Sequence, residues 1–188
     1  MKYYKPTSPS RRNMSSIEYR KFITATRPVK SLVSALKSQA GRNNSGRITV
    51  RHQGGGVKRM YRQVDFKQNF YGITAKVEAI EYDPNRTSFI ARIIYKNGLR
   101  SYIQAPQNLN VGMEIASYKE EGPLKPGNRM PLKYIPVGTA VYSVELNPGQ
   151  GGKLGRSAGV FIGLSAKEAG FANLIMPSGE VRKVLETC

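Results

Sequence analysis

A basic, glycine-rich run over residues 41–62 has the side chains with the clearest chemical potential. Guanidinium groups match phosphate oxygens and guanine edges, and the amides of Asn43 and Asn44 can donate and accept at base edges or ribose 2′-hydroxyls. The glycine triplet 54–56 has no side chains to keep a ligand away from the backbone. The cations of the run are Arg42, Arg47, Arg51, Lys58, Arg59 and Arg62. These residue types indicate contact with nucleic acid.

Residues that would support catalysis or metal binding are scarce. His52 is the sole histidine and Cys188 the sole cysteine, which excludes the usual zinc sites with four Cys or His ligands. No carboxylate follows His52 closely enough to orient it as a general base, so it is expected to contact a nucleotide, or alternatively to face solvent. The glycine-rich run 149–154 has Asn147 and Leu154 where a phosphate-binding P-loop requires glycine and Ser or Thr. We therefore predict no enzyme, no catalytic residue and no metal site.

The distribution of charge indicates a polyanionic partner. The chain has 188 residues with 30 Lys and Arg, 12 Asp and Glu, and a net charge of +18. Residues 1–62 contain 15 of these cations and one acidic residue, Glu18, whereas residues 63–188 are close to balanced, with 15 cations and 11 acidic residues. A segment with so much charge regains the entropy lost on ordering only when a polyanion supplies contacts. We expect residues 1–62 to be a basic arm that folds on binding.

Strand patterns dominate the chain beyond this arm. Asn97-Gly98 separates two β-rich runs and predicts a hairpin with a type I′ turn. A proline-rich stretch over 123–136 is the best linker candidate, and Pro177-Ser178-Gly179 is expected to turn the last pair of strands. The predicted strands span residues 77–82, 89–95, 99–103, 113–118, 139–146, 158–164, 171–176 and 181–185. Short strands with turns at this spacing favour small barrels.

The arm itself has weaker local signals. Pro6 and Pro9 favour an extended conformation over residues 5–12. Apolar residues at helical spacing predict a short helix over 29–40, ending at Gly41. Those residues are Val29, Leu32, Val33 and Leu36. The N-terminus lacks the apolar segment of a secretory signal, and no apolar run is long enough to span a membrane, so no membrane partner is expected.

Ten motifs, in order along most of the chain, resemble the large-subunit ribosomal protein L2 family, in its bacterial and organellar branch. Residues 13–40 match poorly, and Val57 stands where the bacterial pattern usually has histidine. The matching motifs lie at residues 5–12, 41–56, 61–62, 64–67, 81–86, 102–106, 125–128, 135–138, 148–159 and 177–184.

The resemblance implies an all-β fold, with an OB-fold barrel over 63–122, an SH3-like barrel over 123–188 and an extended basic N-terminal arm over 1–62. It implies a structural constituent of the large ribosomal subunit, which binds rRNA and supports assembly of the peptidyl-transferase region and subunit association. Neighbouring ribosomal proteins are implied partners, and Mg²⁺ enters only through the rRNA, with no other cofactor.

The RNA-binding residues predicted from the side chains and from the resemblance form one set. Tyr61 belongs to it as a candidate for stacking on a base, although a core position fits a tyrosine nearly as well. The set comprises Lys5, Arg11, Arg12, Arg42, Asn43, Asn44, Arg47, Arg51, His52, Gly54, Gly55, Gly56, Lys58, Arg59, Tyr61, Arg62, Lys153, Arg156, Arg182 and Lys183.

The family normally continues beyond the position of Cys188 with a long basic tail bearing a His- and Gly-rich motif, which no position here matches. We therefore expect an organellar ribosome, with the mitochondrion first, a plastid second and the bacterial cytoplasm third, and with the tail either lost or supplied by a separate polypeptide. The competing function is a free-standing OB-type protein that binds single-stranded nucleic acid. It requires exposed aromatic residues, for which Tyr95 and Tyr102 are the candidates.

Overall fold

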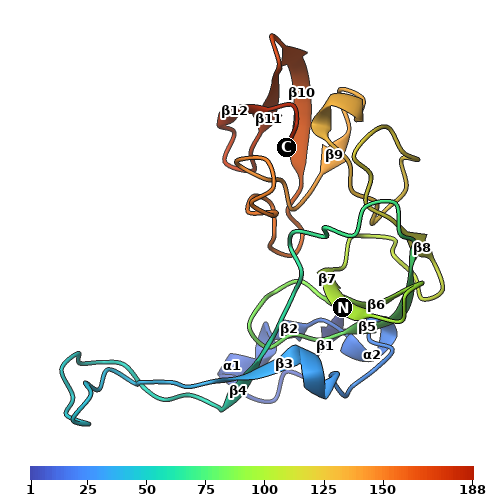
Figure 1. The fold of residues 1–188 in the computed structure, drawn as a ribbon. Coiled ribbons are helices and arrows are strands. Elements are labelled where there is room, and N and C mark those ends of the chain that lie inside the picture. The colour runs from blue at the N-terminus through green and yellow to red at the C-terminus, as the bar shows by residue number, and fades with distance from the viewer.

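The computed structural model describes residues 1–188 and contains two curled, four-stranded antiparallel sheets (Figure 1). The first has the order β7-β6-β5-β8 and consists of β5 (Ala75–Glu81), β6 (Ile90–Tyr95), β7 (Arg100–Gln104) and β8 (Glu114–Ile115). The second has the order β12-β11-β10-β9 and consists of β9 (Ala140–Val141), β10 (Ile162–Glu168), β11 (Phe171–Ile175) and β12 (Val181–Leu185). The predicted all-β class, an OB-fold followed by an SH3-like barrel, is confirmed.

Each sheet encloses a hydrophobic core of its own, because apolar residues alternate along its strands. In β5, Ala75 and Val77 are buried and pack with apolar residues of β6 and β7. The second core gathers residues from β10, β11 and β12 around Leu132 of the short 3₁₀ helix η2 (Leu132–Tyr134). Two separate cores mean that apolar burial stabilises each barrel from within. None of the helices combines the length and the hydrophobicity that a membrane-spanning helix requires.

The tight turns differ in part from those predicted. The hairpin at Asn97-Gly98 joins β6 to β7, but only Gly98 has a positive φ, of 82°, and its N–H donates to the carbonyl of Tyr95 at 2.9 Å. The predicted type I′ turn is therefore wrong, and left-handed Gly98 instead ends a three-residue connection. Two successive positive φ angles occur at Ala169 and Gly170, which join β10 to β11. The predicted turn at Pro177-Ser178-Gly179 is confirmed by a 2.9 Å hydrogen bond from Gly179 N to the carbonyl of Met176.

The bounds of some strands also differ. The strand predicted over 158–164 begins only at Ile162 and runs to Glu168, while β8 and β9 are each shorter than predicted. Residues before Ile162 leave the second sheet and contact the first barrel, since Ala158 N donates to Thr87 Oγ1 at 3.1 Å. Residues 158–161 therefore lie outside the second sheet.

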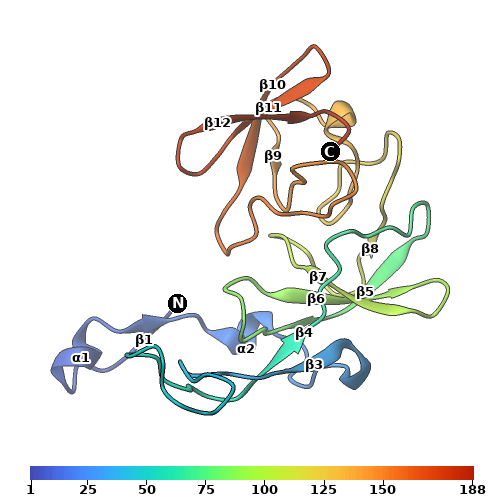
Figure 2. The ribbon, with the colours of Figure 1, turned by 60° about the vertical axis from the view of Figure 1, so that its left-hand side comes forward.

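The N-terminal arm is built from short elements around the first barrel and a long excursion (Figures 1 and 2). Strand β3 pairs antiparallel with β4, and residues 37–58 between them project beyond the barrel. The elements of the arm are β1 (Lys2–Tyr3), α1 (Pro9–Arg12), β2 (Ser15–Ser16), α2 (Tyr19–Phe22), η1 (Lys30–Leu32), β3 (Val33–Leu36) and β4 (Arg59–Arg62). Cross-strand pairing thus gives the arm a defined base.

Two predictions about the arm are wrong. The helix predicted over 29–40 is replaced by η1 and β3, because backbone pairing of β3 with the distant β4 outweighs the helical spacing of the apolar residues. Residues 9–12 form one helical turn rather than extended chain. Pro9 occupies its first position, where the missing N–H has no intrahelical partner to lose.

Candidate nucleic-acid interface

The projecting excursion presents most of the predicted RNA-binding residues to solvent. Every residue from Arg42 to Tyr61 is exposed, and of the predicted cations in the run only Arg62 is partly buried. The chain has seven ion pairs, and Lys21–Glu18 is the only one whose residues lie in 1–62. None of the predicted cations of the arm has a carboxylate partner. Clustered charges of one sign repel one another, so the excursion is suited to a polyanion.

A hydrogen-bonded turn at the tip of the excursion uses some of the polar groups of Arg42 and Asn43, two of the predicted RNA-binding residues. Asn43 Oδ1 accepts hydrogen bonds from the N–H groups of Ser45 and Arg47 at 3.1 and 2.9 Å, and from the Ser45 hydroxyl at 2.8 Å. Arg42 Nη1 donates to the carbonyl of Gly46 at 2.9 Å. The side-chain oxygen of Asn43 therefore stabilises the turn, and only the N–H groups of its side-chain amide remain free to contact a base edge. Asn44 keeps its whole amide exposed.

The glycine triplet has no role in the internal packing of the chain. A Cβ added at Gly54, Gly55 or Gly56 would meet no atom within 4 Å, and only Gly56 has a positive φ, of 60°. Nearby His52 is exposed with a φ of 63°. Because nothing within the chain requires glycine at 54 and 55, close approach of an external ligand to the backbone is the physical reason that fits these positions.

The predicted cations near the N-terminus lie in α1 or shortly before it. Arg11 places its guanidinium carbon 5.5 Å from the centre of the Tyr4 ring, which Lys2 also approaches at 5.2 Å. Lys5 and Arg12 are exposed and have no ion-pair partner. These side chains form a second, smaller basic surface.

The two barrels meet at Phe66, whose carbonyl accepts a hydrogen bond from Gly152 N at 3.0 Å and whose ring contacts two guanidinium groups. The guanidinium carbons of Arg86 and Arg156 are 5.6 and 4.6 Å from the ring centre. Arg86 also lies 5.9 Å from the ring centre of Tyr61, so the base of the arm reaches the same place. Arg156 was predicted as an RNA contact, and its guanidinium edge stays available beside the ring. Arg86 is absent from the predicted RNA-binding set, although it lies within the matching motif at 81–86.

The glycine-rich loop at 149–153 holds a carboxylate of its own chain. Glu145, which is 6% exposed, accepts hydrogen bonds from Gly149 N at 3.0 Å, Gly151 N at 2.7 Å and Arg129 Nη2 at 2.5 Å. A Cβ at Gly152 would lie 2.1 Å from Ser143 Oγ, so side chains are excluded there. The resemblance to a phosphate loop is thus explained by an internal anion. Lys153 at its end is exposed, with Nζ 3.2 Å from Gln150 Oε1.

Arg182 and Lys183 are not brought together with the other predicted residues. Both are exposed on β12, at the end of the molecule opposite the arm (Figure 1). Arg182 is paired with Glu180 at 3.0 Å, which leaves Lys183 as the unpaired cation of this strand.

Tyr95 and Tyr102 cannot serve as stacking platforms, because they are only 6% and 0% exposed. Burial raises the pKa of each phenol to about 12. The exposed aromatic surface that the single-strand alternative requires is therefore not provided by these two residues. The structure also contains no cluster of three or more His, Cys, Asp or Glu side chains that could hold a metal ion.

Comparisons with known proteins match nearly the whole chain. The family model described as Ribosomal Proteins L2, RNA binding N-terminal domain, matches residues 29–117, and the model described as Ribosomal Proteins L2, C-terminal domain, matches residues 125–188. The large ribosomal subunit protein uL2 of Hyphomonas neptunium is 50% identical over 188 residues, which cover 100% of this chain and 67% of that protein. The N-terminal match includes β3, the excursion and β4.

Proposed function

The chain belongs to the ribosomal protein L2 family, and from this premise we propose that it is a structural constituent of the large ribosomal subunit that binds large-subunit rRNA. The observation that carries the proposal is the projecting excursion, whose exposed cations have no carboxylate partners. Membership of a family of structural ribosomal proteins indicates a chain without enzymatic activity of its own.

We assign the contacts by side-chain chemistry. Arg47, Arg51, Lys58 and Arg59 contact phosphates, while the free amide of Asn44 reaches a base edge or a 2′-hydroxyl. The glycines at 54–56 let the backbone lie directly against the RNA. Recognition is then by shape and charge, and Mg²⁺ arrives with the RNA rather than through ligands of this chain.

A second RNA contact is proposed where the barrels meet. Arg86 and Arg156 both lie over the ring of Phe66, and Arg86 also lies over the ring of Tyr61 in β4. Arg156 is exposed and can offer its guanidinium donors to phosphate or guanine, whereas Arg86 also pairs through Nε with Asp83 at 2.5 Å and has only its remaining N–H groups to offer. RNA bound here would touch the arm and both barrels at once.

The dependence of binding on salt tests the proposal. If about eight cations each neutralise a phosphate, the slope of log affinity against log salt should be about −6. It can be measured by filter binding of the full chain to a large-subunit rRNA transcript between about 50 and 200 mM salt. Replacing Arg47 and Arg51 with Gln should make the slope shallower by about 1.5, whereas Lys96→Gln, in the β6–β7 turn, should leave it unchanged. A wild-type slope shallower than about −2 would contradict the polyanion model.

From membership of the family we also propose that the chain supports assembly of the peptidyl-transferase region and subunit association, and that it contacts neighbouring ribosomal proteins. Two statements stay predictions. One is that the chain belongs to an organellar ribosome, with the mitochondrion first. The other is that a separate polypeptide supplies the part of the longer relative that this chain does not cover. Mass spectrometry of the purified ribosome tests them, and one continuous polypeptide carrying the tail would contradict the split.

A further inference from the structure

The chain leaves the first barrel at residue 29, the outgoing limb, and returns to it at residues 64–65, the returning limb. Both limbs are hydrogen-bonded to one residue of the first barrel, Tyr102. On the outgoing limb, Val29 N donates to the Tyr102 hydroxyl at 2.9 Å. On the returning limb, Asp65 N donates to the Tyr102 carbonyl at 2.8 Å, next to a parallel bridge between Val64 and Tyr102. The chain between these contacts contains η1, β3, the excursion and β4. Tyr102 therefore closes the base of the whole projecting unit.

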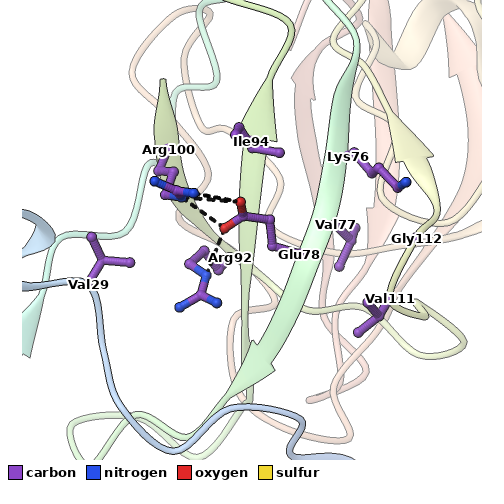
Figure 3. Close-up of a pocket in the computed structure, with 9 residues that line it drawn as sticks. All are labelled: Val29, Lys76, Val77, Glu78, Arg92, Ile94, Arg100, Val111 and Gly112. Carbon is purple, nitrogen blue, oxygen red and sulfur yellow. Dashed lines mark hydrogen bonds and ion pairs between the residues drawn. The ribbon is translucent and has the colours of Figure 1, made fainter. Parts of the chain in front are cut away.

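The hydroxyl that receives Val29 is itself held by a network of ionic groups on the sheet. Tyr102 donates to Glu81 Oε2 at 2.8 Å, and Arg92 Nη1 donates to Glu81 Oε1 at 2.9 Å. Arg92 Nε lies 2.9 Å from Glu78, which also binds Arg100 through both carboxylate oxygens (Figure 3). Burial raises the pKa of Glu81, whereas hydrogen bonds from Arg100 lower the pKa of Glu78. The position of the hydroxyl is thus set by the barrel and not by the arm.

A pocket adjoins Val29 at this junction. It has a volume of about 650 Å³ and lies between Val29 and the sheet face that bears Glu78, Arg92 and Arg100 (Figure 3). Upstream of the pocket, Thr24 is tied to β5, since Thr24 N donates to the Ile80 carbonyl at 3.0 Å and Ile80 N donates to Thr24 Oγ1 at 2.8 Å. The hydrogen bond from Val29 N to Tyr102 is the next directional contact along the outgoing limb, and it is the one directly before η1 and β3.

We propose that Tyr102 is a positioning residue for RNA binding, and that its hydroxyl fixes the outgoing limb so that the excursion enters the rRNA from a defined direction. The proposal rests on the RNA-binding function proposed above and adds how the binding element is oriented. Anchoring both ends removes conformational freedom before RNA arrives, so less entropy is lost on binding. Tyr102 touches no RNA in this scheme.

The donor can be removed without altering the barrel. Val29→Pro deletes the N–H, and the φ of residue 29, −72°, already suits a proline ring. Val29→Ala is the matched control, because it loses the same apolar side chain and keeps the N–H. Tyr102→Phe removes the hydroxyl and keeps the buried ring.

Two measurements on the full chain test the proposal. Affinity for a large-subunit rRNA transcript should fall about three- to tenfold in Val29→Pro and Tyr102→Phe, as expected for one hydrogen bond. Hydrogen–deuterium exchange over residues 30–36 of the free protein should accelerate in both. The double variant should bind like Tyr102→Phe alone, because both changes remove the same contact. The salt slope should stay at the wild-type value, since no phosphate contact is lost.

The outcomes separate this proposal from the function on which it rests. If Val29→Pro exchanges and binds like Val29→Ala, the positioning role is wrong. If exchange accelerates while affinity is unchanged, the contact holds the limb without serving RNA binding, and the proposal is again overturned. Failure of the wild-type chain to bind the transcript would contradict the proposed function instead, and the exchange comparison would still decide whether the Tyr102 hydroxyl anchors the limb.

Discussion

At the scale of single residues, the carboxylate of Glu145 is an anion that the fold itself supplies to the glycine-rich loop at 149–153. Glu145 draws together two backbone N–H groups of the glycine-rich loop and the guanidinium of Arg129. Arg129 in turn donates to the carbonyl of Phe66 at 2.7 Å, so this carboxylate stabilises the second barrel and its contact with the first. The alignment of donors around a buried charge makes the residue hard to replace.

Replacing Glu145 with Gln should therefore destabilise the fold. The amide cannot match the charge of Arg129, and we expect a loss of about 3 kcal/mol in the free energy of unfolding, measured by urea denaturation. Glu180→Gln is the matched control, because the Glu180–Arg182 pair is exposed and should contribute no more than about 1 kcal/mol. Equal effects of the two changes would contradict the structural role of Glu145.

The buried tyrosines predict a loss of stability at alkaline pH. Burial raises the pKa of Tyr95 and Tyr102 to about 12, above the ordinary value of 10.0. Folding thus favours the protonated phenols, so their contribution is fully present below pH 10 and is lost as the pH rises through about 12. Ultraviolet absorbance of ionised tyrosine should rise together with unfolding over this range. Tyr95→Phe should weaken that dependence, and the exposed Tyr3→Phe should not.

At the scale of elements, the antiparallel pairing of β3 with β4 determines the secondary structure at the base of the arm. Residues 33–36 have apolar residues at helical spacing, yet they form a strand because the backbone groups of β4 are available for pairing. The two strands are separated in the sequence by the 22 residues of the excursion, 37–58. The pair acts as a stalk, and the excursion needs no apolar core of its own. The predicted fold-on-binding behaviour is therefore proposed for the excursion and not for the stalk.

Shortening the excursion separates these roles. Leu36 and Arg59 are direct partners, so an Asn-Gly loop can replace residues 37–58 and close the hairpin. The barrels should keep their thermal stability by circular dichroism. Affinity for the rRNA transcript should fall about tenfold or more, and the salt slope should become shallower by about 4 because five cations are removed. Unchanged affinity would show that RNA binds elsewhere.

At the scale of the whole molecule, the carboxylates are distributed so that the arm keeps its charge. Six of the seven ion pairs lie within residues 63–188, where acidic and basic residues are nearly balanced. The barrels thus neutralise much of their own charge, and the arm, residues 1–62, retains most of the net charge of the chain. At the joint between the barrels, Arg86 of the first and Arg156 of the second both contact the ring of Phe66.

Removing the Phe66 ring should loosen the two barrels relative to each other. In Phe66→Ala both guanidinium–ring contacts are lost, while each hydrophobic core stays intact. Nuclear spin relaxation should then give different rotational correlation times for the two barrels, where the wild-type chain gives one. Phe161→Ala removes an exposed phenylalanine of the second barrel and serves as control. A single correlation time in Phe66→Ala would mean that other contacts hold the joint.

The sequence by itself determined the charge segregation, the all-β class, the hairpin at Asn97-Gly98 and the family, because these depend on composition, local alternation and short motifs. It placed the cations of the excursion correctly in one basic segment. Their individual assignment to RNA stays a prediction, as do the domain boundaries at 62 and 122.

Only the tertiary structure decided which residues act together. Val29 and Tyr102 are 73 positions apart, and Phe66 meets Arg156 from another barrel, so no local pattern could reveal either contact. The same holds for the strand at 33–36, whose partner lies across the excursion. Backbone hydrogen bonds and buried charges are satisfied by groups that come close only when the chain is folded, and this is why the anchor of the arm was invisible in the sequence.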